Sequence, residues 1–402
     1  MFEEVLHKIE KFIESNHWCG WDPYDGLNSK FLKFLTFDHK LPRITATQFM
    51  KRFPVNLRRI LGVPKSRNPK AMGIIARAYL MRYQETKEQK YLDKTKEILD
   101  WLVTCSCTGY SGYAWGHNFD WQSSVFYLPK GVPTVVNTSF IVHAFLDAYE
   151  ALKEKIYLDV ARSTCDFVLK DLNRTYLSEI KKLPSAIGDQ SSVYCFSYSP
   201  IDKTCVHNAN LLATELLARV YSFTKETELF EQCNRSVRFT MQHQNNDGSW
   251  FYALGQRQRY IDSFHTGFEL SSIKNILNYL DYVDRDGFKQ KLRKGYKYYK
   301  KTFFDADGLP NFYYNRIFPI DLHCTSQGII TFLKFKEYDT GAVDMANKIA
   351  SWAIENMWDD KKGYFYFQKT NYFTNKIPYL RWPNVWMFYA LTLLRAEQCQ
   401  NT

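Results

Sequence analysis

The stretch from Gln244 to Asn278, QNNDGSWFYALGQRQRYIDSFHTGFELSSIKNILN, contains the unit from which the whole chain is built. It begins at the turn sequence Asn246-Asp247-Gly248, because Gly, Asn and Asp tolerate a positive φ. Three aromatic residues and a short basic loop follow, and then Asp262 and His265 open an apolar segment. The stretch therefore predicts a turn between two helices, with polar side chains at the start of the second helix.

The head of this second helix recurs along the chain at a constant spacing. A His or Arg opens an apolar segment every 58 residues, since 265 − 207, 323 − 265 and 381 − 323 all equal 58, and these residues are His207, His265, His323 and Arg381. Comparable positions further back (207 − 137 = 70 and 137 − 68 = 69) are Asn137 and Asn68. The turn with its aromatic residues also recurs, at residues 109–115, 188–198, 307–314 and 359–366. A fixed period longer than one helix is typical of repeat proteins and here predicts about six helix pairs.

The helix pairs predict a closed ring. No alternating apolar and polar run of useful length appears, so the fold class is all-α. Helix pairs can stack as an open solenoid or close on themselves. The ends of a solenoid need polar capping repeats, whereas the final helical segment, WMFYALTLLRAE (386–397), is as apolar as the middle ones. The sequence therefore predicts a single domain over residues 1–402, an (α/α)6 barrel of six helical hairpins in a toroid, with the inner helix starts around one cleft.

The apolar spacing also predicts where individual helices lie. Short or broken helices are expected between Lys30 and Leu61, because Pro42 and Pro54 interrupt that region. The longest irregular stretch runs from Cys105 to Pro133, and a second predicted loop covers residues 183–204. Further helices are expected over residues 1–17, 91–101, 157–172, 205–223, 229–243, 288–303 and 343–357. Others are expected to begin near residues 68, 137, 321 and 381.

Composition restricts the class of protein. Of the 402 residues, 45% are hydrophobic, which is enough for a large core, and no run of about 18 apolar residues predicts a membrane span. The N-terminus, MFEEVLHKIEKFIESNHW, carries acids early and does not resemble a secretory signal. Nine Cys without any CxxC spacing predict reduced thiols and a cytoplasmic protein.

The net charge of +11 favours an acidic partner. The Lys and Arg residues are mixed with acids on helix faces and form no arm or long run, so nucleic acid is the partner that the pattern favours least. An acidic polysaccharide or an anionic membrane surface is compatible with the charge, and so is a solvated Lys-rich surface without a partner.

Several motifs resemble those of one family. They are W-D-P-Y-D-G-L (21–27), V-H-N-A-N-L-L (206–212), D-S-F-H-T-G-F-E-L (262–270), D-L-H-C-T-S-Q-G-I (321–329) and R-W-P-N-V-W-M (381–387). They are similar to motifs of a bacterial and archaeal family encoded with capsule and exopolysaccharide biosynthesis genes. That family is similar in pattern to six-hairpin glycosidases and to terpenoid-cyclase toroids. The resemblance covers nearly the whole chain and implies a toroid acting on an oligo- or polysaccharide.

Two Asp–His pairs are the candidate catalytic residues: Asp262 with His265, and Asp321 with His323. Carboxylates and imidazoles at helix starts around one cleft can do acid/base chemistry. The two Asp residues could form a glycosidase pair. Alternatively, His265 or a Tyr in the cleft could abstract the proton beside a uronate carboxylate, as in a C5-epimerase or lyase. The structural alternative is that each Asp is a helix N-cap, although His is not a favoured cap.

The candidate substrate-binding residues surround the same predicted cleft. Aromatic side chains can stack on sugar rings, and Arg381 and Asn137 could neutralise a substrate carboxylate. The bland alternative, packing between hairpins, is favoured for Trp250, whereas the glycines and polar residues around Trp115 favour the cleft. The substrate-binding set is Trp115, His117, Asn137, Tyr198, His207, Arg381 and Trp382.

No metal or cofactor is predicted. His207, His265 and His323 could share a zinc ion with Cys205 or Cys324 nearby, but inner helices of such a ring diverge, and no HExxH or CxxC spacing is present. Two function classes stay open. One is an enzyme of polysaccharide biosynthesis or modification, of the uronyl C5-epimerase, lyase or hydrolase type. The other is a non-catalytic, glycan-binding scaffold.

Overall fold

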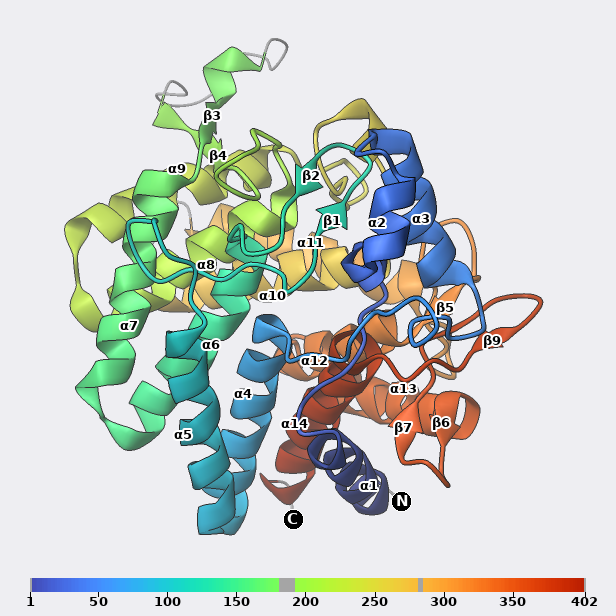
Figure 1. Ribbon diagram of the computed structural model, residues 1–402. Coiled ribbons are helices and arrows are strands. Elements are labelled where there is room, and N and C mark those ends of the chain that lie inside the picture. The colour runs from blue at the N-terminus through green and yellow to red at the C-terminus, as the bar shows by residue number, and fades with distance from the viewer. Residues whose placement is uncertain (1, 181–191, 281–284, 401–402) are drawn as a thin grey trace. The chain divides into compact units, whose positions relative to one another are not determined.

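The computed structural model describes residues 2–180, 192–280 and 285–400, and the chain divides into two compact units (Figure 1). Unit 1 comprises Met1–Cys105, Gly116–Val132 and Phe303–Thr402. Unit 2 comprises Ser106–Trp115 and Pro133–Thr302. Consecutive helices pack in pairs in both units, which is the arrangement that the sequence period predicts.

Unit 1 is built around three long apolar helices. In it α14 packs against both α4 and α12, while α5, α13 and α1 lie against α4, α12 and α14 respectively. Figure 1 shows α1 and α14 side by side. The helices of the unit are α1 (Phe2–Ser15), α2 (Lys30–Leu35), α3 (Lys40–Arg52), α4 (Pro69–Thr86), α5 (Gln89–Thr104), α12 (Leu322–Lys334), α13 (Ala342–Met357) and α14 (Trp386–Gln400).

Unit 2 repeats this arrangement. Helix α8 packs against α6 and α10, and α7 and α9 lie against α6 and α8. Nearly all of α8 is buried, from His207 to Val220, as expected for a helix that other helices enclose. The helices are α6 (Val135–Leu152), α7 (Lys155–Asp166), α8 (His207–Thr224), α9 (Thr227–Gln242), α10 (Ser263–Tyr279) and α11 (Arg285–Phe303).

Three hairpins turn through the same short sequence, a Tyr followed four residues later by Lys-Glu. The Lys has a left-handed φ of 59–60°, and its N–H donates to the Tyr carbonyl, which closes the first helix. The Lys ammonium also lies over the same Tyr ring. The next residue, Glu, is the N-cap of the second helix. The pairs are Tyr83–Lys87, Tyr149–Lys153 and Tyr221–Lys225, and the sequence analysis overlooked them.

The strands in the described part of the chain are two or three residues long, which confirms that strands contribute little. They pair antiparallel as β1 (Trp121–Gln122) with β2 (Tyr127–Leu128), β3 (Arg174–Tyr176) with β4 (Tyr194–Phe196), and β6 (Trp358–Asp359) with β7 (Tyr364–Phe365). A three-stranded sheet joins β5 (Ile320–Asp321), β8 (Gln368–Lys369) and β9 (Thr374–Asn375) in that order. In it Asp321 pairs with Gln368, and Gln368 with Asn375.

The turn at 246–248 has the predicted conformation. Gly248 has a φ of +101°, and a Cβ there would lie 2.7 Å from the Lys294 carbonyl oxygen of α11, so only Gly fits. Trp250 is 1% exposed and donates from Nε1 to the Thr240 carbonyl. Its ring lies where a Cβ on Gly295 of α11 would clash. Trp250 therefore packs the hairpin, as the sequence favoured.

The predicted helices are present with boundaries shifted by a few residues. Asn68 caps α4, and Pro69 is its first residue, as expected. The predicted helix 157–172 is shorter than expected, because α7 ends at Asp166 and a π-helical turn, Phe167–Asp171, follows. Gly188 and Asp189, which begin one predicted turn, lie outside the described residues, as does part of the predicted loop at 183–204. No helix in the described ranges is long and apolar enough to cross a bilayer.

Candidate active site

Asp262 and His265 form a hydrogen-bonded dyad at the start of α10. Asp262 is the N-cap, and its Oδ1 accepts from the backbone N–H of His265 at 2.9 Å. Its Oδ2 lies 2.7 Å from Nδ1 of the His265 ring. The carboxylate is 2% exposed and the imidazole side chain is 17% exposed. Because Nδ1–H donates to the carboxylate, we assign Nε2 as the nitrogen that carries a lone pair.

Aromatic rings hold this imidazole in place. The Phe264 and Tyr252 rings lie 3.9 and 4.4 Å from it, centroid to centroid. Tyr252 in turn stacks on Tyr260 at 4.9 Å with an 11° interplanar angle. An imidazole that a carboxylate orients through Nδ1 and that stays partly exposed has the arrangement of a general base.

Buried polar groups without partners gather on the inner helices of the same unit. Both carboxyl oxygens of Glu269 and both amide atoms of Asn137 lack a hydrogen-bond partner among the residues that the structure describes, although each residue is 1% exposed. The same holds for single oxygens of Asn208 and Ser263. An atom left without any partner costs about 1–3 kcal/mol, so each of these atoms is open to a hydrogen bond from a buried water molecule or a polar ligand.

The surroundings of Glu269 favour its neutral form. Burial raises its pKa well above 4.5, and the nearby Asp262 carboxylate raises it further. A protonated carboxyl can donate a hydrogen bond to an oxygen that gains negative charge. The sequence analysis did not single out Glu269, although an acid inside an otherwise apolar helix, F-E-L (268–270), is a signal that could have found it.

The second predicted pair, in unit 1, has the same cap but a different ring environment. Asp321 caps α12, and its Oδ1 accepts from the backbone N–H of His323 at 2.9 Å. The same Oδ1 accepts from Nε1 of Trp382 at 3.0 Å, while Oδ2 accepts from Nε2 of Gln368 at 3.1 Å. The His323 ring is fully buried, edge-on to Trp382 at 4.2 Å and parallel to Trp386 at 5.1 Å. Asp321 therefore bonds Trp382 and Gln368 with its side chain, and not the imidazole.

Burial raises the pKa of Asp321 from 3.8 to about 6, although the Lys51 ammonium opposes the shift. Lys51 donates to the Tyr24 hydroxyl at 2.7 Å, and the Tyr24 ring lies edge-on to Trp382 at 5.6 Å. Gln368, Lys51 and Tyr24 were not among the sequence candidates, because they come from segments far from the 58-residue repeat.

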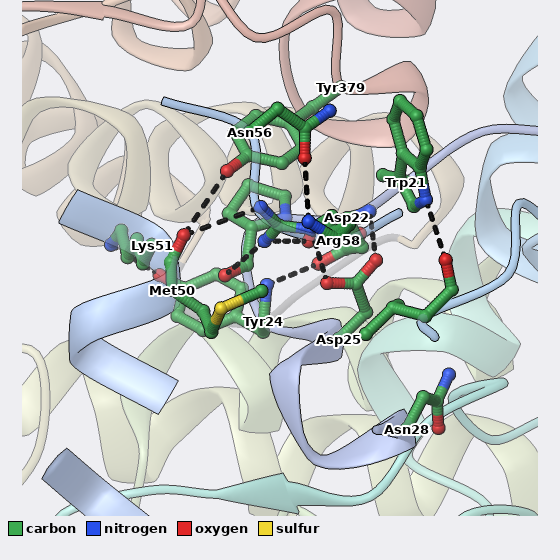
Figure 2. Close-up of polar contacts among 12 residues, drawn as sticks. Trp21, Asp22, Tyr24, Asp25, Asn28, Met50, Lys51, Asn56, Arg58 and Tyr379 are labelled. Carbon is green, nitrogen blue, oxygen red and sulfur yellow. Dashed lines mark hydrogen bonds and ion pairs between the residues drawn. The ribbon is translucent and has the colours of Figure 1, made fainter. Parts of the chain in front are cut away.

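Two buried ion pairs fix the loop that carries Tyr24, and Figure 2 shows the first of them, between Arg58 and Asp25. Arg58 donates to Asp25 at 2.7 Å and to the Asp22 carbonyl at 2.9 Å, and its guanidinium lies over the Tyr379 ring at 4.6 Å. Burial raises the pKa of Asp25 to about 6. In the second pair Arg381 makes two hydrogen bonds to the Asp22 carboxylate, at 2.5 and 2.9 Å. The charge of Arg381 is thus already neutralised, so we do not assign it to a substrate carboxylate.

The other predicted binding residues are buried. The Trp115 ring is fully buried and stacks between Tyr113 and Phe145, which is the environment of a packing residue. His207 is 1% exposed and lies 3.3 Å from the Thr240 hydroxyl, and burial lowers its pKa to about 3. Tyr198 is 8% exposed, and its carbonyl accepts from the backbone of Val135.

His117 belongs to unit 1 and is 8% exposed. Its ring stacks on Phe119 at 4.8 Å, and its Nδ1 has no hydrogen-bond partner among the described residues. Burial, with help from the Arg381 and Lys70 charges, lowers its pKa well below 6.5. His117 is therefore neutral.

A shared zinc ion would need at least three ligating side chains close together. Within residues 2–180, 192–280 and 285–400, no three His, Cys, Asp or Glu side chains lie together as a metal site requires. None of the nine cysteines, all of which lie in the described ranges, forms a disulfide.

Unit 1 also contains an open groove of about 1140 Å³. The end of α3, the loop before β5 and the β8–β9 hairpin form it, and the side chains of Lys51 and Gln368, which neighbour Asp321, line it. A groove of this size exceeds most small-molecule pockets, which span roughly 300–1,000 Å³.

No family model and no curated protein matches the sequence, but solved structures match the fold. The cellobiose 2-epimerase of Bacillus thermoamylovorans has a TM-score of 0.61 at 13% identity, over 82% of this chain and 88% of that chain. The GH76 α-mannanase of Bacteroides thetaiotaomicron has a TM-score of 0.62 at 14% identity, over 84% and 88%. An unsaturated glucuronyl hydrolase specific for heparin has a TM-score of 0.59 at 12% identity, over 84% and 88%.

These structural neighbours are six-hairpin glycosidase-like enzymes, namely epimerases, hydrolases and isomerases of carbohydrates. The match confirms the predicted fold class, an all-α (α/α)6 toroid. At identities of 12–14% the likeness establishes the fold and leaves the reaction to be argued from the residues. The single-domain organisation and the gathering of all four candidate catalytic residues in one cleft stay predictions.

Proposed function

We propose that the protein is an enzyme that transfers a proton on a saccharide, in an epimerase- or isomerase-type reaction with His265 as general base. The observation that carries this proposal is the Asp262–His265 dyad, in which a buried carboxylate orients an accessible imidazole. The carbohydrate enzymes among the structural neighbours support the substrate class.

The reaction needs a base and a stabiliser for the charge that develops. Nε2 of His265 takes the proton from a carbon beside a carbonyl or carboxylate group, and the electron pair of that C–H bond moves onto the oxygen. We assign the hydrogen bonds to that oxygen to the Glu269 carboxyl and the Asn137 amide, because both are buried in unit 2 without a partner among the described residues. A proton that solvent delivers to the opposite face of that carbon, with the His265 proton lost to solvent, gives an epimer. Return of the His265 proton to the neighbouring carbon, with the hydroxyl proton moved from one oxygen to the other, gives an isomer.

Deuterium incorporation tests this proposal. Wild-type protein, His265→Gln and the control His39→Gln, which changes an exposed His, are incubated in deuterated water with a panel of neutral and acidic saccharides. We expect carbon-bound deuterium in at least one saccharide with wild type and control, and none with His265→Gln. Binding without turnover of any saccharide would support the non-catalytic scaffold instead.

A hydrolase is the second candidate, and the raised pKa of Asp321 favours it. A carboxyl with a pKa of about 6 is suited to protonate a leaving oxygen. The same incubations distinguish the two reactions, because new reducing ends without carbon-bound deuterium would indicate hydrolysis. Under that reading Asp321→Asn, and not His265→Gln, removes the larger part of the activity.

A further inference from the structure

The groove in unit 1 has a wall of aromatic side chains that water reaches. Phe49 and Phe53, at the end of α3, are 46% and 36% exposed and stack at 5.0 Å with a 28° interplanar angle. At the tip of the β8–β9 hairpin, Tyr372 is 92% exposed and Phe373 is 38% exposed. Exposed aromatics clustered around a groove are typical of a binding surface, and their flat faces suit the C–H faces of sugar rings.

The charged side chains that line the groove are all cations. Its cations are Lys51, Arg52 and Arg316, and no Asp or Glu is among the described residues that line it. Arg52 and Arg316 are exposed and have no carboxylate partner in the described part of the chain, and the Arg316 guanidinium lies over the Tyr313 ring at 4.4 Å. A concave surface with unpaired cations attracts anions, and a guanidinium can bind a carboxylate through two parallel hydrogen bonds.

Amide side chains complete the lining. Asn375 donates to the Lys51 carbonyl at 3.3 Å, which ties the β8–β9 hairpin to the end of α3. Gln368 lines the groove and donates to Asp321, so the groove reaches the cap of α12. Gln48 and Asn371 also line it and add donors and acceptors of the kind that sugar hydroxyls use.

We propose that this groove binds an acidic oligosaccharide, with sugar rings on the aromatic wall and uronate carboxylates on Arg52 and Arg316. The volume of about 1140 Å³ suits several sugar units better than one. The inference rests on the proposed function only in taking the ligand to be a saccharide, since every group it uses belongs to unit 1.

A matched ligand pair tests the proposal by calorimetry on the full-length protein. The probes are tetragalacturonate and its methyl ester, which keeps the sugar rings and removes the carboxylate charges. Arg52→Gln/Arg316→Gln removes the two exposed cations of the groove, and Lys301→Gln/Lys361→Gln, which changes two exposed Lys residues outside the groove, is the charge-matched control. Tyr372→Ala and Phe34→Ala, exposed aromatics inside and outside the groove, form the aromatic pair.

We expect tetragalacturonate to bind at least about tenfold more tightly than the methyl ester, which is the weaker end of what one charge-assisted contact contributes. The double Arg variant should remove this preference, and Tyr372→Ala should weaken both probes. Both controls should bind as wild type does. Higher salt should weaken tetragalacturonate alone, because exposed charges are screened.

Equal affinities for the two probes, no binding of either, or full affinity in the double Arg variant would overturn the proposal. His265→Gln separates this result from the proposed function. If that variant binds tetragalacturonate normally and wild type exchanges no deuterium into any saccharide, the groove proposal stands and the proposed reaction fails. If wild type exchanges deuterium into a saccharide but the groove binds neither probe, only the groove proposal fails.

Discussion

The two Asp–His pairs look alike in the sequence, yet their imidazoles have opposite environments. Each Asp caps an inner helix and bonds a His backbone N–H at 2.9 Å. In α10 the carboxylate also bonds the His265 ring, which is 17% exposed. In α12 the His323 ring is fully buried beside Trp382 and Trp386, and the carboxylate bonds Trp382 and Gln368.

One residue of spacing explains the difference. His265 is the third residue of α10, a position from which a side chain reaches back to the cap, as in a capping box. His323 is the second residue of α12, and one residue rotates a side chain by about 100° around the helix axis. The shorter spacing therefore turns the His323 ring away from its cap and into the core. The same period along the chain thus gives one oriented base and one packing residue.

The largest expected effect is on catalysis in unit 2. His265→Gln should lower the rate of deuterium exchange by about 10²- to 10⁴-fold, the usual contribution of a general base. His323→Gln should keep the rate within a few-fold at temperatures where its circular dichroism shows a folded protein. Equal losses of exchange rate in the two variants would contradict the different roles assigned to the two imidazoles.

Asp262→Asn should have the next largest effect. Asn remains a good N-cap, but its amide N–H facing Nδ1 favours the ring tautomer whose Nε2 carries the proton, so the base is lost. We expect exchange to slow by about 10²-fold or more with little change in melting temperature. A rate close to wild type would show that the carboxylate does not set the tautomer of His265.

His323→Ala should act on stability. Removing a fully buried ring leaves a cavity between Trp382 and Trp386, and such deletions cost about 2–4 kcal/mol. His265→Ala removes a partly exposed ring and should cost about 1 kcal/mol. Urea denaturation of both variants measures the difference, and a larger loss in His265→Ala would contradict the assigned environments.

Asp321→Asn should change how stability depends on pH. Because burial raises the pKa of Asp321 from 3.8 to about 6, the folded protein holds a proton that the unfolded chain releases between these pH values. This contribution to stability is full below about pH 4 and is lost as the pH rises through 6, by up to about 3 kcal/mol.

The unfolding free energy of Asp321→Asn should therefore fall less than that of wild type between pH 4 and pH 7. Asp25, whose pKa is also raised to about 6, contributes equally to the pH dependence of both proteins. It therefore does not affect the difference between them. Parallel pH profiles of the two proteins would contradict the raised pKa of Asp321. Urea denaturation at several pH values measures the unfolding free energies of the two proteins.

The sequence predicted the fold because the signals that specify it are local and recur along the chain. The 58-residue period, the cap at Asn68 and the turn before Trp250 depend on neighbours in the chain. The Tyr-x-x-x-Lys-Glu turn is equally local, and a search for repeated short sequences could have found it. The predicted helix 157–172 was too long because apolar spacing does not separate an α-helix from the π-helical turn that ends it.

The candidate site was less predictable because its environment comes from distant segments. Asp321 receives hydrogen bonds from residues 47 and 61 positions away, and Arg381 pairs with Asp22, 359 positions away. Sequence spacing places Arg381 at a helix head but cannot show that its charge is already paired. Likewise, only burial distinguishes Glu269 as an unpartnered acid and Trp115 as a packing residue.

Modification with diethyl pyrocarbonate tests the central claim most directly, because the reagent attacks neutral imidazoles that solvent reaches. Peptide mapping by mass spectrometry follows each His, while deuterium exchange follows activity in the same samples. The account predicts that modification of His265 and loss of exchange share one rate constant, and that His323 stays unmodified in the folded protein. Full activity after complete modification of His265, or reaction of His323 before His265, would contradict it.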